Sequence, residues 1–290
     1  MNGTSSLPSL PSSSAPSPFR RPLTILALLL ALLCASFVGP ATHAQAAASS
    51  RKGVSVNSVA GASQALADLG GSWYYSWASN PGTVARPAGT EFVPMIWGAG
   101  SVTDAALAEA RQQGTQLLGF NEPDMAAQAD MTVEQALDLW PRLQSTGLRL
   151  GAPSVAYGGD TPGGWLDRFM SGAAARGYRV DFIPLHWYGG DFGSAAAEQL
   201  RGYLQAVYDR YRKPIWLTEY ALIDFSGGTP RYPSEREQTD FVRSSTAMLE
   251  SQPYVERYSW FTLSIETSRT GLYNGATPNA SGLAYREAGR

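Results

Sequence analysis

Eight short apolar or aromatic segments, separated by stretches of helical periodicity, constrain most strongly how this chain folds. The segments cover 53–56, 72–77, 91–97, 116–121, 149–155, 181–188, 214–221 and 257–263. Helical periodicity predicts helices over 62–69, 103–113, 132–146, 164–176, 194–211, 234–251 and near 283–288. Strands that alternate with helices over about 240 residues are typical of repeated βα units. The sequence therefore predicts an α/β protein of the (β/α)8 barrel type, the TIM barrel.

Local signals support this assignment. Thr103 precedes one predicted helix, and Ser234 with Glu237 forms a capping box at the start of another. Gly114 and Gly147 stand where helices should end. The gap between the second and third segments is too short for a full helix, so we expect a reduced or missing helix there. A doubly wound open sheet is the main alternative, but no Gly-x-Gly-x-x-Gly turn follows the first segment.

The first 46 residues differ in character from the rest and match an export signal. A Ser- and Pro-rich start is followed by Arg20 and Arg21, an apolar run over 23–38 and small residues over 41–46. A membrane span needs a run of about 20 apolar residues. We expect cleavage after Ala44 or Ala46, a catalytic domain over 47–290, an extracellular location and no stable membrane association after cleavage. An uncleaved segment would instead be an N-terminal membrane anchor.

Composition excludes several classes of partner and cofactor. The formal net charge is −2, it becomes −4 without Arg20 and Arg21, and no basic run follows, so a nucleic-acid partner is not expected. Cys34 is the only cysteine and one of the two histidines also lies in the signal, so neither a disulfide nor a metal site is expected. Charged residues make up only 16%, while all 8 Trp and all 14 Tyr follow residue 46. We therefore expect a single domain that acts as a monomer and has a surface suited to sugars.

Two glutamates stand at the ends of predicted strands, which is where the active site of such a barrel is built. The fourth segment ends in Asn121 and Glu122, and the seventh ends in Glu219. An acidic residue directly after a buried strand is costly unless it is paired or used. Hydrolysis of a glycosidic bond with retention requires two carboxyl groups about 5 to 5.5 Å apart, and it requires no cofactor. The two strand ends can supply that spacing across a barrel.

Four motifs together resemble a known family. They are Gly119-Phe-Asn-Glu-Pro-Asp124, Leu185-His-Trp-Tyr188, Leu217-Thr-Glu-Tyr220 and Tyr258-Ser-Trp-Phe261, in an order similar to that of glycoside hydrolase family 128, β-1,3-glucanases of clan A. The resemblance covers essentially all of 47–290. It implies that Glu122 is the general acid/base, that Glu219 is the nucleophile and that Asn121 hydrogen-bonds the 2-hydroxyl of the sugar. It also implies a secreted, retaining endo-β-1,3-glucanase with a polysaccharide substrate and no cofactor.

Further residues are expected near the two glutamates. His186 and Tyr188 lie two apart on the sixth segment, so they share a face that we expect to point into the site. Aromatic rings near other strand ends are expected to contact sugar; these are Trp77, Trp97, Trp260 and Tyr220. Asp124 is expected to bond loop backbone and not to take part in catalysis.

Two alternatives remain open at the level of sequence. The same clan includes hydrolases of mannan, xylan and β-1,4-glucan, because loops and not the two glutamates set specificity. A protein that binds a glucan without cutting it is the other alternative, although it would be expected to have lost a glutamate, and both Glu122 and Glu219 are present.

Overall fold

The computed structural model describes residues 49–289, and the predicted signal peptide over 1–46 lies outside them. The strands are β1 (Lys52–Ser55), β2 (Trp73–Tyr75), β3 (Glu91–Phe92), β4 (Gln116–Leu117), β5 (Arg149–Leu150), β6 (Ile183–Gly189), β7 (Ile215–Leu222), β8 (Val255–Trp260), β9 (Tyr273–Asn274) and β10 (Thr277–Pro278). The helices are α1 (Ala62–Leu69), α2 (Asp104–Gln113), α3 (Val133–Gln144), α4 (Trp165–Ala175), α5 (Ala196–Tyr211), α6 (Glu235–Ser251) and α7 (Ala280–Glu287), with a 3-10 turn η1 (Ala99–Ser101). Strand and helix alternate along most of the chain, as predicted.

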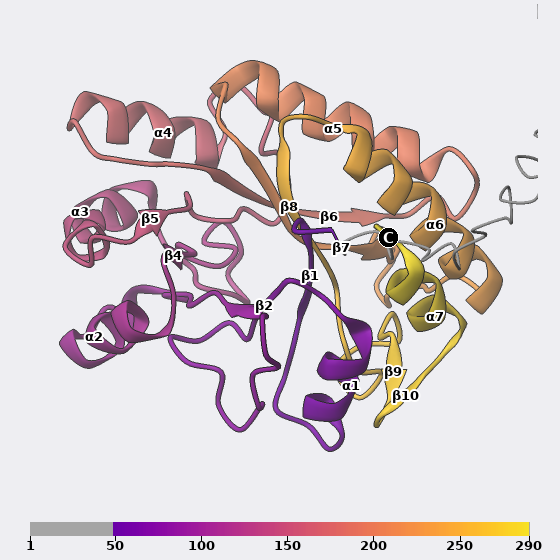
Figure 1. The fold of residues 1–290 in the computed structure, drawn as a ribbon. Coiled ribbons are helices and arrows are strands. Elements are labelled where there is room, and N and C mark those ends of the chain that lie inside the picture. Colours follow the sequence, from indigo (N-terminus) through magenta and orange to yellow (C-terminus); the bar gives the residue numbers. More distant parts are fainter. Residues whose placement is uncertain (1–48, 290) are drawn as a thin grey trace, which may run out of the picture. The chain divides into compact units, whose positions relative to one another are not determined.

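Strands β1 to β8 follow one another around a parallel ring. Six of them form one sheet in the order β3-β2-β1-β8-β7-β6, and β4 pairs with β5 in a second sheet. Two isolated parallel bridges, Met95 with Leu118 and Gly151 with Phe182, join the two sheets at both edges. The helices lie outside the strands (Figure 1). The α/β barrel predicted from the sequence is therefore confirmed.

The helix expected to be reduced or missing between β2 and β3 is missing. Residues 76–90 contain no helix, and side chains hold this segment to its neighbours. Ser63 of α1 accepts a hydrogen bond from the backbone of Ala85, and Ser79 donates one to Glu109 of α2. The short antiparallel pair β9–β10 between β8 and α7 was not predicted, because four residues give too little periodicity to recognise.

Two separate sets of buried side chains form the core. The larger lies between the strands and the surrounding helices. The smaller fills the inside of the ring and contains Trp73, Tyr75, Val93, Met95, Leu118, Phe182 and Trp216. Large aromatic residues from alternate positions of β2 therefore point inward, since successive side chains of a strand face opposite sides.

The ends of several helices carry the expected caps. Thr103 accepts a hydrogen bond from the backbone of Ala106, and Ser234 and Glu237 form both bonds of the predicted capping box. A second capping box, Thr132 with Gln135, also starts α3. Among residues 49–289, no helix combines the length and the apolar character that a membrane crossing requires.

Candidate active site

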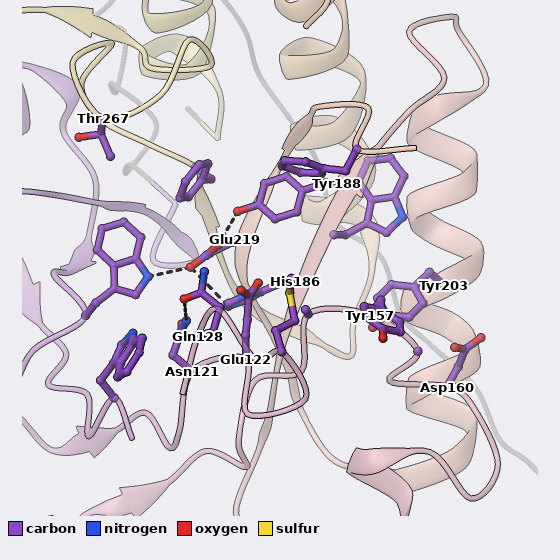
Figure 2. Close-up of a pocket in the computed structure, with 18 of the residues that line it drawn as sticks. Asn121, Glu122, Gln128, Tyr157, Asp160, His186, Tyr188, Tyr203, Glu219 and Thr267 are labelled. Atoms are coloured by element: carbon purple, nitrogen blue, oxygen red, sulfur yellow. Dashed lines mark hydrogen bonds and ion pairs between the residues drawn. The ribbon is translucent and has the colours of Figure 1, made fainter. Parts of the chain in front are cut away.

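A cleft of about 950 Å³ lies at the carboxyl ends of the barrel strands. Seven of the nine residues singled out from the sequence line it: Trp77, Trp97, Asn121, Glu122, His186, Tyr188 and Glu219. Figure 2 shows Thr267 toward one end of this cleft, Tyr157, Tyr203 and Asp160 toward the other, and both glutamates between them. The cleft is therefore longer than the pair of glutamates, and its two ends differ in the residues that line them.

The structure brings Glu122 and Glu219 together. Both side chains are buried, with 8% and 4% of the residue surface exposed. One carboxylate oxygen of each and a ring nitrogen of His186 all lie within 4.8 Å of one another. This separation matches the roughly 5 to 5.5 Å of retaining glycosidases and is shorter than the 6.5 to 9.5 Å that inverting enzymes need for a water molecule.

Three donors surround the carboxylate of Glu219. The indole N–H of Trp77 donates to Oε1 over 2.7 Å, and the Tyr188 hydroxyl donates to Oε2. The Tyr75 hydroxyl lies 3.2 Å from Oε1 and 3.1 Å from the backbone carbonyl of Thr218, and its single proton is shared between these two acceptors. Burial and the nearby charge of Glu219 raise the pKa of Tyr75 and of Tyr188 well above the usual value, so both hydroxyls keep their protons and remain donors. Hydrogen bonds to an ionised acceptor are the stronger kind, and these stabilise its negative charge.

A column of aromatic rings positions two of those donors. The rings of Trp73 and Trp216 lie 5.3 Å apart deep in the barrel, Tyr75 stacks on Trp73 at 6.1 Å, and Trp77 packs edge-on against Tyr75 at 5.1 Å. Trp73, Tyr75 and Trp77 alternate in sequence, so they face the same side of the chain. The inner core therefore fixes the groups that contact Glu219, in keeping with the close packing of protein interiors.

The backbone holds Glu122 in an unusual conformation. Its φ angle is +43°, in the left-handed region that costs a non-glycine residue about 1 kcal/mol or more. Its N–H donates to the carbonyl of Ser154 on the β5 side over 2.7 Å, and its carbonyl accepts from Met125. The neighbouring strand thus helps to hold the side chain of Glu122 in the cleft.

His186 lies between the two carboxylates. Its Nδ1 is 2.8 Å from Oε1 of Glu122, and its Nε2 is 3.5 Å from Oε1 of Glu219. Burial of the ring opposes protonation, but the charges of Glu219 and Glu122 outweigh this effect, and the pKa of His186 is raised above 6.5. A protonated imidazole between two carboxylates offsets part of their mutual repulsion.

We expect His186 to make stability depend on pH. Because the pKa of His186 is raised in the folded state, its protonation adds to the free energy of unfolding. This stabilisation is complete below about pH 6.5, where the unfolded chain also binds the proton, and it is lost as pH rises through the folded-state pKa. The difference in free energy of unfolding between the wild type and His186→Gln should therefore shrink from pH 5.5 to pH 9 in urea titrations. A difference that stays constant over this range would contradict the assignment. His186 is the only histidine after residue 46, so NMR can measure its pKa without overlap.

Asn121 precedes Glu122 and is almost fully buried at the edge of the cleft. Its Nδ2 lies 3.5 Å from the side-chain oxygen of Gln128, while its Oδ1 has no hydrogen-bond partner among the described residues. A buried carbonyl oxygen without a partner is costly. A substrate hydroxyl in the cleft could supply the missing hydrogen bond.

Two predicted sugar contacts lie in the core instead of the cleft, so these predictions are wrong. Trp260 and Tyr220 are fully buried, and both rings pack against Phe241 of α6. The physical reason is the alternation of side chains along a strand: the neighbours of inward residues point outward. Glu219 faces the cleft and Tyr220 therefore faces the helices. Phe261, next to Trp260, lines the cleft in its place.

Other cleft residues were not recognised from the sequence. Tyr75 lies beneath the cleft in the inner core, and its contact with Glu219 was not recognised either, although its alternation with Trp77 was visible in the sequence. Tyr157, Phe225 and Gln128 lie in loops, where no periodicity indicates which way a side chain points. Asp124 behaves as predicted: its carboxylate accepts a hydrogen bond from the backbone N–H of Ala156 over 2.9 Å.

Glu122, His186 and Glu219 could also hold a metal ion. They offer oxygen and nitrogen ligands within 4.8 Å of one another, a cluster that sequence spacing did not reveal. The aromatic donors around Glu219 account for its carboxylate oxygens without a cation.

Comparison with known proteins places this site in context. Residues 53–290 match the family described as glycosyl hydrolase catalytic core. Alkali-sensitive linkage protein 1 of Schizosaccharomyces pombe is 31% identical over 229 residues, which are 77% of this chain. The chain spans 40% of the length of that curated relative.

Solved structures give closer matches. A family 128 subgroup I endo-β-1,3-glucanase from Amycolatopsis mediterranei, in complex with laminaritriose, is 68% identical, with 83% of this chain and 100% of that chain covered and a TM-score of 0.82. Other structures of that enzyme with β-1,3-linked oligosaccharides carry Gln or Ala at one of two glutamates, which are 97 positions apart. A subgroup III curdlan-specific exo-β-1,3-glucanase from Blastomyces gilchristii is 29% identical, with 82% and 97% covered and a TM-score of 0.66.

Proposed function

The chain belongs to glycoside hydrolase family 128, and on this premise we propose that it cuts β-1,3-glucan chains internally, with retention of configuration. The observation that carries the proposal is the pair of buried carboxylates, Glu122 and Glu219, within 4.8 Å at the ends of two barrel strands. The two glutamates are 97 positions apart, as are the two replaced in the structures of the Amycolatopsis enzyme. The 68% identity to that endo-acting enzyme supports internal cutting.

We assign the nucleophile to Glu219. In the first step, a carboxylate oxygen of Glu219 attacks the anomeric carbon, and the bond from that carbon to the glycosidic oxygen breaks. Contacts from Trp77, Tyr75 and Tyr188 hold this carboxylate in place and fix its direction of attack. A nucleophile held in this way loses little freedom when it reacts.

Glu122 is assigned as the acid and base. It gives its proton to the departing oxygen in the first step, and in the second it takes a proton from the water that releases the sugar from Glu219. His186 is 2.8 Å from its carboxylate and positions it. Asn121, with its unpartnered Oδ1, accepts a hydrogen bond from the 2-hydroxyl of the sugar in this proposal, and Trp97 offers a ring for stacking.

A panel of polysaccharides tests the proposed substrate. We expect the purified protein to release reducing oligosaccharides of several lengths from β-1,3-glucan, and little or nothing from β-1,4-glucan, mannan or xylan. Size-resolved products distinguish internal from terminal cutting, since an exo enzyme gives one small product from the start. Activity on another polymer alone would keep the two-glutamate mechanism and overturn the substrate. Binding to a glucan without any cutting would favour a binding protein.

We also propose that residues 1–46 direct export and that the domain over 47–290 acts as a monomer. The charged flank, apolar run and small residues before Gln45 and Ala47 support the first proposal. Mass spectrometry of the secreted protein should show an N-terminus at one of these two residues, and size-exclusion chromatography with light scattering should give the mass of one domain. An intact N-terminus on a membrane-bound protein would contradict export by cleavage.

A further inference from the structure

Two exposed aromatic rings line the cleft. Tyr157 is 71% exposed and Phe225 is 55% exposed. The ring of Phe225 packs edge-on against Tyr188, so part of its role is explained by contact with a group that holds Glu219. No ring contact of this kind accounts for Tyr157 among the described residues. An exposed aromatic ring in a cleft is a typical binding feature, because it combines a large apolar face with a polar hydroxyl.

The loop that carries Tyr157 is held by hydrogen bonds to Asp124 and to three side chains of α5. The carboxylate of Asp124 accepts from the N–H of Ala156. The hydroxyls of two tyrosines on α5, Tyr203 and Tyr211, bond the N–H and the carbonyl of Gly159 over 3.3 and 3.1 Å. Arg210 of α5 donates to the carbonyl of Asp160 over 3.0 Å.

Glycine at position 159 is needed for this arrangement. A Cβ atom there would lie 2.7 Å from the hydroxyl of Tyr203 and 3.0 Å from a methyl group of Leu185, so the loop could not approach α5 as closely. Fixing a surface loop by four hydrogen bonds costs conformational entropy. The backbone that carries Tyr157 is consequently preorganised beside the cleft, which reduces the entropy lost on binding.

The position of Tyr157 relative to the two glutamates indicates what it binds. Asp124, which holds its loop, is only two residues from Glu122. Figure 2 shows Tyr157 with Tyr203 and Asp160 on one side of the glutamates, and Thr267 on the other. Because the acid gives its proton to the departing oxygen, the sugars that leave begin beside Glu122, next to the loop that Asp124 holds.

We propose that Tyr157 is the binding platform for the leaving sugars, and for the acceptor sugar when the enzyme transfers instead of hydrolysing. This inference rests on the proposed retaining mechanism. In transfer, a hydroxyl oxygen of the acceptor attacks the anomeric carbon, Glu122 takes the proton of that hydroxyl, and the bond to Glu219 breaks and returns its carboxylate. The acceptor occupies the place that the leaving sugars have vacated, so both processes use Tyr157.

Competition between water and an added sugar tests the inference. The donor is a 4-nitrophenyl β-glycoside of laminaribiose, the acceptor is laminaribiose, and the ratio of transfer to hydrolysis is followed as acceptor is added to the full protein. We expect Tyr157→Ala to raise the acceptor concentration for half-maximal transfer on the order of tenfold. Tyr157→Phe and Tyr157→Trp should restore most of the transfer, since they keep a ring. Leu283→Ala, which truncates a 40% exposed apolar side chain on α7 outside the cleft, is the matched control.

The outcomes separate this inference from the proposed function. A wild-type protein that releases neither nitrophenol from the donor nor sugar from β-1,3-glucan would contradict both. The inference alone is overturned if nitrophenol is released normally and the acceptor concentration for half-maximal transfer is the same in the wild type and in Tyr157→Ala. It is also overturned if the wild type transfers sugar to no acceptor. A loss of acceptor binding in Phe225→Ala but not in Tyr157→Ala would also overturn the assignment to Tyr157.

Discussion

Replacement of Glu219 by Gln is expected to lower kcat on β-1,3-glucan by roughly 10⁴-fold or more, since loss of a nucleophile removes the covalent route altogether. An amide has the shape of a carboxylate but cannot attack the anomeric carbon. The amide oxygen of Gln can still accept from the indole of Trp77, and its NH2 group can donate to the hydroxyl of Tyr188, which can also accept, so the fold should survive. Reducing-sugar release measures the rate, and circular dichroism with thermal unfolding measures the fold.

The matched control is Glu134→Gln, an exposed glutamate in the first turn of α3. It removes the same charge without touching the cleft and should leave kcat unchanged. A near-normal rate for Glu219→Gln would overturn its assignment as nucleophile. If Glu219→Gln loses activity because it unfolds, Glu219→Asp becomes the test variant. It keeps the charge but places the carboxylate farther from the anomeric carbon, so its kcat should also be strongly reduced.

Replacement of Glu122 by Ala is expected to lower kcat on the polymer by about 10²- to 10⁴-fold, the usual contribution of general acid and base catalysis. The expected signature is a dependence on the leaving group. Nitrophenolate departs without a proton, so a nitrophenyl glycoside should still form the intermediate on Glu219 and release nitrophenol in a rapid burst. The second step should then be slow, because no base activates water, and a small anion such as azide should accelerate it.

Glu134→Ala is the corresponding control and should show neither the burst nor the effect of azide. If substrates with good leaving groups gain no advantage over the polymer in Glu122→Ala, then Glu122 is not the acid. The two variants together distinguish the roles, since only loss of the acid depends on the leaving group.

Much of the fold follows from periodicity and from helix caps. Predicted helices such as 62–69 and 234–251 coincide with α1 and α6 to within a residue, because apolar spacing and caps are local properties of the sequence. Strand ends were less well placed. The fourth and fifth segments were predicted as six and seven residues but pair regularly over only two, β4 and β5, because a barrel can continue through isolated bridges.

The candidate site also contains residues that the sequence predicted correctly and residues that it did not. Glu122 and Glu219 were identified because a charge directly after a buried strand is a local anomaly that sequence displays. Trp260 and Tyr220 were assigned incorrectly because strand ends alone do not fix which side of the sheet a residue faces. Tyr157 could not be found, since its direction depends on hydrogen bonds to α5, more than forty positions away.

The closure of the ring also sets the order in which the protein can form. β1 pairs with β8. The ammonium group of Lys52 donates hydrogen bonds to the carbonyls of Tyr285, Arg286 and Ala288, which lie 233 to 236 positions later. The ribosome therefore must finish almost the whole chain before the first strand acquires its second neighbour and its buried charge acquires partners. Contacts so distant in sequence delay folding. The ring consequently cannot close before residues 255–288 have been synthesised, which is compatible with the export that we propose for this chain.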